Sequence, residues 1–496
     1  MRAIENYTAM KKYPIFKGYI EHFGKTSIDN DIPGMLSFFF IQGQLAVPYV
    51  RIPWGASHLD PRVHAFWIQS SRTGKSIAWE FIGDILNDIN VPTDLYTTGT
   101  DAGLIGGFEE SKDSEGNVEN VLKEGFLNGR KALNFDEGSI ILNPNKHSQE
   151  TVLYLQSACN PVGSNNNTLV KHTKAGRIET ESLVSLWITT YPPSGVKEYV
   201  LTKGIFQRVL LYWSNWSMER RMNVSQIRAQ SAFKKQEKMK VTYEEITSYF
   251  IDLEKRLRNK ILDVTETSFV EWDSMTRLEQ EELLQDSMTS VFTADDSFYP
   301  AMYDAIEDYY ELLTGLGPGI SEVVASFIPA MENYTVIFST HMAMMDESWV
   351  VKGEYVDMSK EILYDLFKNL IQWLEGEVEI GPKVAERATQ RNKWIVAFQQ
   401  VEPVELGNKG EGWRKKGNLM STYMTQNGVT RGTAFNHFSK WASSMFDTAK
   451  DGKVVYLRLK DPMTDVIALF WIQESLTGTS LDVKQWQKQM GIGEEE

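Results

Sequence analysis

The 496-residue chain contains a single cysteine, Cys159. One cysteine excludes a disulfide framework and a zinc site made of cysteines, and it is typical of a reducing compartment. Long hydrophobic runs are also missing, since the apolar stretch at 37–41 is too short to span a bilayer. Residues 1–5 continue into polar sequence and not into the apolar segment of a signal peptide. We therefore expect a soluble cytoplasmic protein with no membrane partner.

Positive charge is scarce as well. The chain has 51 Lys and Arg against 66 Asp and Glu, a net charge of −15. A surface that is acidic on the whole does not attract nucleic acid, so any such contact must come from a local basic element. The length is sufficient for about two to four domains with a large core.

The stretch at 69–76 reads Gln-Ser-Ser-Arg-Thr-Gly-Lys-Ser, between an apolar strand pattern and an apolar helical pattern. Strand, loop and helix in this order are the context of a phosphate-binding loop (P-loop), in which backbone N–H groups hold phosphates. Lys75 would reach the β- and γ-phosphates of ATP, and Ser76 would hold Mg²⁺. Gln69 stands where the motif has its first glycine, and the alternative is a chance Gly-Lys-Ser in a turn. The predicted nucleotide-binding residues are Ser71, Arg72, Thr73, Gly74, Lys75 and Ser76.

An apolar strand pattern at 131–135 runs directly into Asp136 and Glu137. A strand that ends in Asp-Glu is typical of the second half of an ATPase site. There Asp136 would support the Mg²⁺ shell and Glu137 would polarise the attacking water. The alternative is an ordinary strand followed by an acidic turn.

Two further strands are expected at 183–188 and 208–213. The first ends in Thr189 and Thr190, at the place where ligands bind in open α/β sheets. Strands alternate with helices throughout 61–221, which predicts an α/β core with a parallel sheet.

The rest of the chain divides by composition. Residues 1–60 are expected to be a short mixed lead-in with a strand at 45–52, and 222–400 a helical lid or linker region. Residues 461–496 would be a tail that ends in acidic sequence. The expected helices of the helical region lie at 244–261, 302–313, 320–345 and 358–378.

At 411–460 the pattern predicts a winged helix: a helix, an Asn-Gly turn, a second helix capped by Thr430, and a β-hairpin. Arg431, His437 and Lys440 could meet phosphate or a DNA groove. A partner-binding winged helix or an unrelated helical cap is the alternative.

The order of these pieces resembles the AAA+ ATPases, and more narrowly the minichromosome maintenance helicases and their compact relatives in phages and mobile elements. In that family a small glycine-leucine segment opens an insertion after the P-loop, and 101–104 fits that place. The family's extra hairpin, which carries a lysine towards the DNA channel, corresponds to 169–180 with Lys171, Lys174 and Arg177. A plain solvated connection is the alternative for this hairpin.

The resemblance further implies an arginine finger, and Arg208 fits its position. The family's sensor asparagine has no counterpart, so Thr190 or Thr189 would take that role. The large N-terminal DNA-binding domain of the family is missing.

These observations lead us to expect a ring-forming, ATP-driven replicative DNA helicase, most simply a hexamer, with ATP and Mg²⁺ as cofactors. Single-stranded or forked DNA and further copies of the chain would be its partners, and a primase, a polymerase or a loader is a further candidate. A phage DNA-packaging motor resembling the large terminase subunits is one alternative, because their P-loops contain an arginine as Ser71-Arg72-Thr73 does. An AAA+ protein remodeller is the other.

Overall fold

The computed structural model divides into two compact units: Met1–Glu307 with Phe327–Val378, and Asp308–Ser326 with Glu379–Glu496. The structure describes residues 3–97, 101–112, 118–136, 138–142, 149–164, 166–173, 176–193, 196, 204–231, 239–377, 391, 393–410 and 412–460. Glu137, Lys174 and the expected tail at 461–496 therefore lie outside the described residues.

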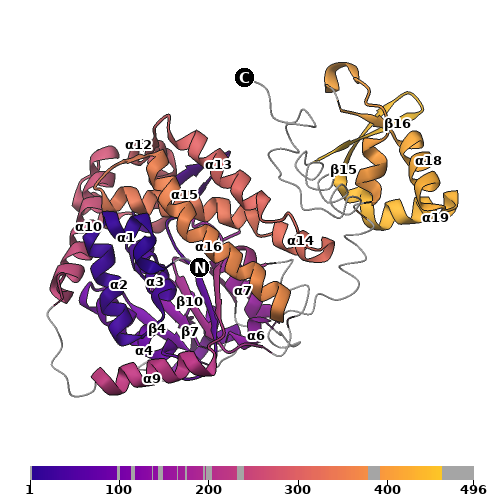
Figure 1. The fold of residues 1–496 in the computed structure, drawn as a ribbon. Coiled ribbons are helices and arrows are strands. Elements are labelled where there is room, and N and C mark those ends of the chain that lie inside the picture. Colours follow the sequence, from indigo (N-terminus) through magenta and orange to yellow (C-terminus); the bar gives the residue numbers. More distant parts are fainter. Residues whose placement is uncertain are drawn as a thin grey trace. The chain divides into compact units, whose positions relative to one another are not determined.

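A five-stranded parallel sheet forms the centre of the first unit, in the order β11-β3-β10-β7-β4 (Figure 1). This confirms the predicted α/β fold with a parallel sheet. Every residue of β3, β7 and β10 is buried, as expected for strands that are covered on both faces. The strands are β3 (Ala65–Gln69), β4 (Thr93–Tyr96), β7 (Ala132–Phe135), β10 (Ser185–Thr190) and β11 (Leu210–Ser214).

The first sixty residues differ from the expected mixed lead-in. They form α1 (Thr8–Lys12), α2 (Pro14–Thr26) and α3 (Asp31–Ala46), followed by the short hairpin of β1 (Ile52–Trp54) and β2 (Ser57–Leu59). The strand expected at 45–52 is wrong, because Leu45 and Ala46 end α3. Every residue of α3 from Ile32 onward is buried. An apolar run that is covered on all sides shows no periodicity that separates helix from strand.

Two hairpins interrupt the alternation of strands and helices. Helix α4 (Lys75–Asp88) follows β3, and α5 (Asp101–Ile105) leads into the antiparallel pair β5 (Gly106–Lys112) and β6 (Val118–Glu124). The second hairpin pairs β8 (Thr168–His172) with β9 (Arg177–Glu181), directly before β10, where the sequence predicted it. Between β7 and β8 lie α6 (Ser139–Leu142) and α7 (Gln149–Ala158).

The region after β11 is helical, as predicted, with one correction: the helix expected at 320–345 is two helices. Capping boxes at Thr242, Ser268 and Thr276 begin three of these helices, since each side chain accepts from the backbone N–H three residues on. The elements are η2 (Ile205–Gln207) before β11, then α9 (Met218–Ser231), α10 (Tyr243–Val264), α11 (Phe269–Ser274), α12 (Arg277–Val291), β12 (Thr293–Ala294), α13 (Phe298–Glu311), α14 (Pro318–Ala325), α15 (Ile328–Met345), β13 (Val350–Val351) and α16 (Gly353–Glu377).

Within the second unit, residues 393–460 fold around a small aromatic core that includes Trp394, Tyr423 and Phe438. A helical segment at 393–399 precedes a three-stranded antiparallel sheet in the order β14-β16-β15. The predicted helix–turn–helix and hairpin are present, and Thr430 caps the second helix as expected. The elements are η3 (Gly407–Lys409), β14 (Arg414–Lys415), α18 (Lys416–Asn427), α19 (Arg431–His437), η4 (Phe438–Ala442), η5 (Ser443–Met445), β15 (Phe446–Asp451) and β16 (Val454–Leu459).

Candidate nucleotide-binding site

The loop between β3 and α4 contains two residues with positive φ just before the helix begins. Gly74 has φ = +101°, a value that favours glycine, and Arg72 also has a positive φ of +61°. A Cβ at Gly74 would lie 2.7 Å from Oγ of Ser27. Helix α4 begins at Lys75 with no side chain capping it, and Ser76 is exposed in its first turn. The N–H groups of this helix start are available to an anion.

Gln69, which replaces the first glycine of the motif, connects the loop to Trp67 and Asn30 through side-chain hydrogen bonds. Its side chain is fully buried, accepts a hydrogen bond from Nε1 of Trp67 at 2.5 Å, and donates to Oδ1 of Asn30 at 3.1 Å. Asn30 in turn donates to the carbonyl of Thr73 at 2.8 Å, and Ser27 donates to the carbonyl of Gly74 at 3.1 Å. The turn between α2 and α3 therefore holds the loop from outside, an arrangement that the sequence motif did not indicate.

Lys75 folds back over the loop. Its Nζ donates to the carbonyls of Gln69 at 2.5 Å and Ser70 at 2.9 Å, and lies 4.6 Å from the ring centre of Tyr191. Burial lowers the pKa of Lys75 to about 8, although the negative charge of Asp136 opposes that shift. An ammonium group that is desolvated in this way gains more from a phosphate than an exposed one does.

The sheet order brings Asp136 to the P-loop. Strand β10 lies between β3 and β7, so the residues that follow all three strands meet at one edge. Thr189 and Thr190 are both buried at the end of β10, and the hydroxyl of Thr189 donates to Oδ1 of Asp136 at 2.7 Å. Thr189, not Thr190, therefore orients the carboxylate. Within the described ranges no three His, Cys, Asp or Glu side chains gather into a group that could hold a metal ion, and Ser76 and Asp136 are the Mg²⁺ ligands that the sequence predicts in this part of the chain.

A cavity of about 360 Å³ lies beside β11 and the turn between α2 and α3, and residues 69–76 do not line it. Ser214, in its lining, pairs with Gln69 across the sheet, and Asp29 and Asp31 flank the Asn30 that holds the loop. Burial and the neighbouring Asp29 raise the pKa of Asp31. Sequence reasoning missed Asp29 and Asp31, because they lie some forty positions upstream of the motif.

Arg208 lies at the opposite end of the sheet from the P-loop of its own chain, just before β11 begins. It is partly buried, and its guanidinium donates to Oδ1 of Asn160 at 2.6 Å and to the carbonyl of Gly204 at 2.8 Å. Burial lowers the pKa of Arg208. Within one chain, Arg208 is not brought together with Lys75 and Asp136.

The β8–β9 hairpin carries Lys171 on its first strand and Arg177 on its second. Arg177 is exposed and pairs with Glu179 at 2.7 Å, with both side chains about half exposed. Lys174, in the predicted turn, is outside the described residues.

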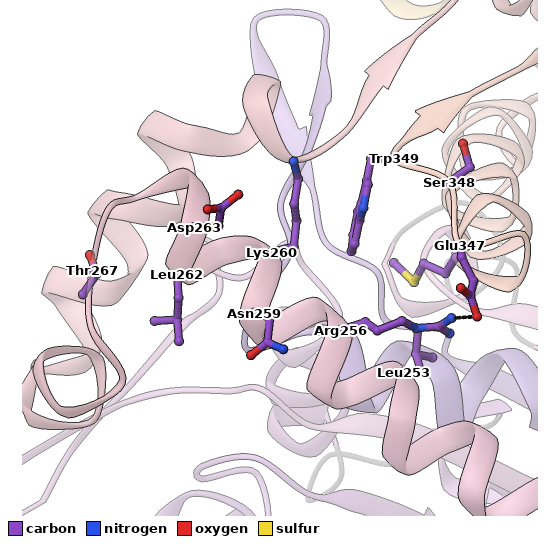
Figure 2. A pocket seen from close by; sticks show the side chains of 11 residues that line it. Leu253, Arg256, Asn259, Lys260, Leu262, Asp263, Thr267, Glu347, Ser348 and Trp349 are labelled. Carbon is purple, nitrogen blue, oxygen red and sulfur yellow. Dashed lines mark ion pairs between the residues drawn. The ribbon is translucent and has the colours of Figure 1, made fainter.

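A second cavity, of about 730 Å³, contains none of the predicted site residues. It lies between α10 and the segment that follows α15, and Arg256 and Glu347 form an ion pair across it (Figure 2). Lys260 lies above the ring of Trp349, with Nζ 5.6 Å from the ring centre.

Comparisons with protein-family models and with curated proteins found no match. None of the helices in the described ranges is long and apolar enough to cross a membrane.

Proposed function

We propose that the chain is an ATPase, with the P-loop at 69–76 as the site for the nucleotide phosphates. The observation that carries this proposal is the meeting of Lys75 with the Thr189–Asp136 pair at one edge of the parallel sheet. Lys75 supplies a positive charge at the start of α4, and Asp136 supplies a carboxylate at the end of β7. A Mg²⁺–ATP complex requires both charges, one for the phosphates and one for the metal ion. ATP and Mg²⁺ are the proposed cofactors.

In this site the chain's own groups bind and orient the nucleotide. The N–H groups at the start of α4 and the ammonium of Lys75 would hold the phosphates, while Ser76 and Asp136 would hold Mg²⁺, which neutralises charge on the phosphates. Thr189 keeps the Asp136 carboxylate in place. Glu137 is proposed to take the proton of the attacking water.

We propose further that this ATPase is of the AAA+ type and works as a ring-forming DNA helicase. Three features support this: the β5–β6 insertion after α5, the β8–β9 hairpin directly before β10, and the winged-helix pattern of residues 393–460. Arg208 would complete the site of a neighbouring subunit, because it lies at the other end of the sheet from its own P-loop. The β8–β9 hairpin, with Lys171, Lys174 and Arg177, would contact the DNA backbone.

Two other functions remain as alternatives. A DNA-packaging motor would need a nuclease with clustered acidic metal ligands after the ATPase, and helices α9 to α16 occupy that part of the chain. A protein remodeller would use the same ATPase site without DNA. ATP hydrolysis that is stimulated by DNA separates the helicase and the packaging motor from the remodeller, and unwinding of a forked substrate separates the first two.

The test is turnover of ATP by the wild type and by Lys75→Ala and Glu137→Gln, with and without forked DNA. Lys75→Ala should weaken ATP binding, whereas Glu137→Gln should bind ATP and hydrolyse it poorly, because only water activation is removed. Unchanged turnover in both variants would remove the ATPase proposal. Normal turnover without DNA stimulation or unwinding would remove only the helicase proposal.

A further inference from the structure

Positive charge is concentrated near the end of an otherwise acidic chain. Residues 412–460 contain nine Lys and Arg but only two acidic residues, Asp447 and Asp451, whereas the whole chain has a net charge of −15. A local net charge of +7 in so short a segment is the footprint expected of an element that approaches a polyanion.

The same segment has the element order of a helix-turn-helix. Helix α18 ends at Asn427, Gly428 takes the left-handed conformation with φ = +61°, and α19 begins after Thr430. The side chain of Thr430 accepts from the N–H of Thr433 and so fixes where α19 starts. A short turn that contains glycine between two packed helices is typical of this motif, whose second helix enters the major groove of DNA.

Helix α19 presents cations around an exposed aromatic ring. Phe435 is 43% exposed although the unit has its own buried core. The guanidinium of Arg431 lies 5.7 Å from the centre of this ring, and Nζ of Lys416 on α18 lies 6.0 Å from it. Nζ of Lys416 also lies 4.4 Å from the ring centre of Phe438, the residue that follows α19. Arg431 and Lys416 thus form a cationic pair at the start of α19.

The hairpin of β15 and β16 adds a second basic element. Lys450 and Lys453 are exposed on either side of the turn at Asp451 and Gly452. Arg458 is the less available cation here, because it lies 3.6 Å from Asp447 and stacks on Trp413.

We propose that residues 393–460 bind double-stranded DNA, with α19 in the major groove and the β15–β16 turn against the phosphate backbone. This binding does not depend on ATP or on the motor's own hairpin. A helix flanked by a basic hairpin fits the wide major groove of B-DNA, whereas the deep and narrow major groove of an RNA duplex does not admit it. Lys416, Arg431, Lys450 and Lys453 are assigned to phosphate contacts.

The test measures binding of the 496-residue chain to a 25-base-pair DNA duplex, without nucleotide, by fluorescence anisotropy over a series of salt concentrations. All proteins carry Lys174→Ala, which removes the motor hairpin's proposed contact. One variant is Lys416→Gln with Arg431→Gln, and a second is Lys450→Gln with Lys453→Gln. The matched control is Lys11→Gln with Lys255→Gln, two exposed lysines of the first unit.

Each of the two variants should bind the duplex at least tenfold more weakly than the parent at the same salt. The slope of log affinity against log salt should fall by about 0.9 for each phosphate that the protein no longer neutralises. The control should stay within about twofold of the parent. Parent protein that does not bind the duplex, or equal binding by all variants, would overturn the proposal and leave a protein partner as the occupant of this surface.

Equal affinity for an RNA duplex of the same sequence would overturn the groove assignment. The outcome is independent of the ATPase proposal, because a Lys75→Ala protein without ATP turnover should bind the duplex as the parent does.

Discussion

The hydroxyl of Thr189 donates a hydrogen bond of 2.7 Å to Oδ1 of Asp136, and this contact joins two strands that are far apart in the sequence. Asp136 follows β7 and Thr189 lies near the end of β10, which the sheet places next to each other. The contact makes Thr189 a positioning residue for the carboxylate that is proposed to support Mg²⁺.

Thr189→Val should lower ATP turnover about tenfold, because a hydrogen bond to a charged group contributes about 1.5–3 kcal/mol. It should also raise the Mg²⁺ concentration that half-maximal turnover requires, a change that a purely structural defect would not produce. Thr189→Ser keeps the hydroxyl and should restore both values. Thr190→Val is the matched control, and a larger effect of Thr190→Val would return the sensor role to Thr190.

The affinity for ATP should fall as the pH rises above about 8. The pKa of Lys75 is lowered to about 8 in the free protein, so its proton is lost there, whereas bound phosphates would stabilise the ammonium form. Above about pH 8, Lys75 must therefore take up a proton when ATP binds. The affinity should fall by up to about tenfold per pH unit, until the pH reaches the pKa that Lys75 has in the ATP complex. Calorimetry at about pH 7–9.5 in two buffers measures this uptake. Lys75→Arg stays charged and should show no uptake; an equally pH-independent wild type would contradict the prediction.

The lowered pKa of Lys75 has a second consequence for stability. Between about pH 8 and the ordinary pKa of 10.5, Lys75 binds more protons in the unfolded chain than in the folded chain. The contribution of Lys75 to the free energy of unfolding therefore rises with pH in this range. Below pH 8 the buried charge is a cost to the free protein. Lys75→Met should therefore be more stable than the wild type at about pH 7, and the difference in unfolding free energy should shrink towards about pH 10. A difference that is constant with pH would be evidence against burial as its cause.

Gln69→Gly should destabilise the protein although it restores the motif's first glycine. The change leaves Nε1 of Trp67 and the side chain of Asn30 without their partner, and a buried polar group without a partner costs about 1–3 kcal/mol. A lower midpoint of thermal unfolding and weaker ATP binding are expected, since Asn30 holds the carbonyl of Thr73. Gln69→Met keeps most of the side-chain volume and removes both hydrogen bonds, so it separates the volume of the side chain from its polar contacts. Stability equal to the wild type for Gln69→Gly would show that this network does not support the loop.

Arg208→Ala and Lys75→Ala proteins, each inactive, should partly recover ATP turnover when mixed. In a mixed ring, some interfaces combine the intact P-loop of an Arg208→Ala subunit with the intact arginine of a Lys75→Ala subunit. Such interfaces should be active if Arg208 acts on the nucleotide of a neighbouring subunit. Asn160→Ala is the control, because it removes the contact that Arg208 makes within its own chain and should leave turnover nearly unchanged. Absence of recovery at every mixing ratio, with subunit exchange demonstrated, would refute the trans arrangement. Inactivity of Asn160→Ala would instead point to a structural role of Arg208.

Lys174→Ala should abolish unwinding of forked DNA while basal ATP turnover remains. The hairpin lies before β10 and contributes no described residue to the nucleotide site, so the chemistry should not depend on it. Arg177→Ala should have a smaller effect, because Arg177 is already paired with Glu179. Lys255→Ala serves as a control for charge. Wild-type unwinding and DNA stimulation by Lys174→Ala would show that this hairpin does not translocate DNA.

Local signals in the sequence predicted the elements of the candidate site and of the second unit. The strand–loop–helix around Lys75, the strand that ends at Asp136, the two-armed hairpin before β10 and the capped helix at Thr430 all follow from short-range periodicity and from capping residues. These depend on neighbours within a few positions, so the sequence alone predicts them.

Only the tertiary structure decided which parts of the chain meet. The strand order, set by hydrogen bonds between distant segments, selects Thr189 over Thr190 as the partner of Asp136. Helix α3 is buried on all sides, so its sequence shows no periodicity that separates a helix from a strand. Gln69 departs from its motif because the turn at Asn30, brought in from the N-terminal helices, supports the loop through the glutamine side chain. Such contacts arise from packing over long separations in the chain, and no local pattern of residues encodes them.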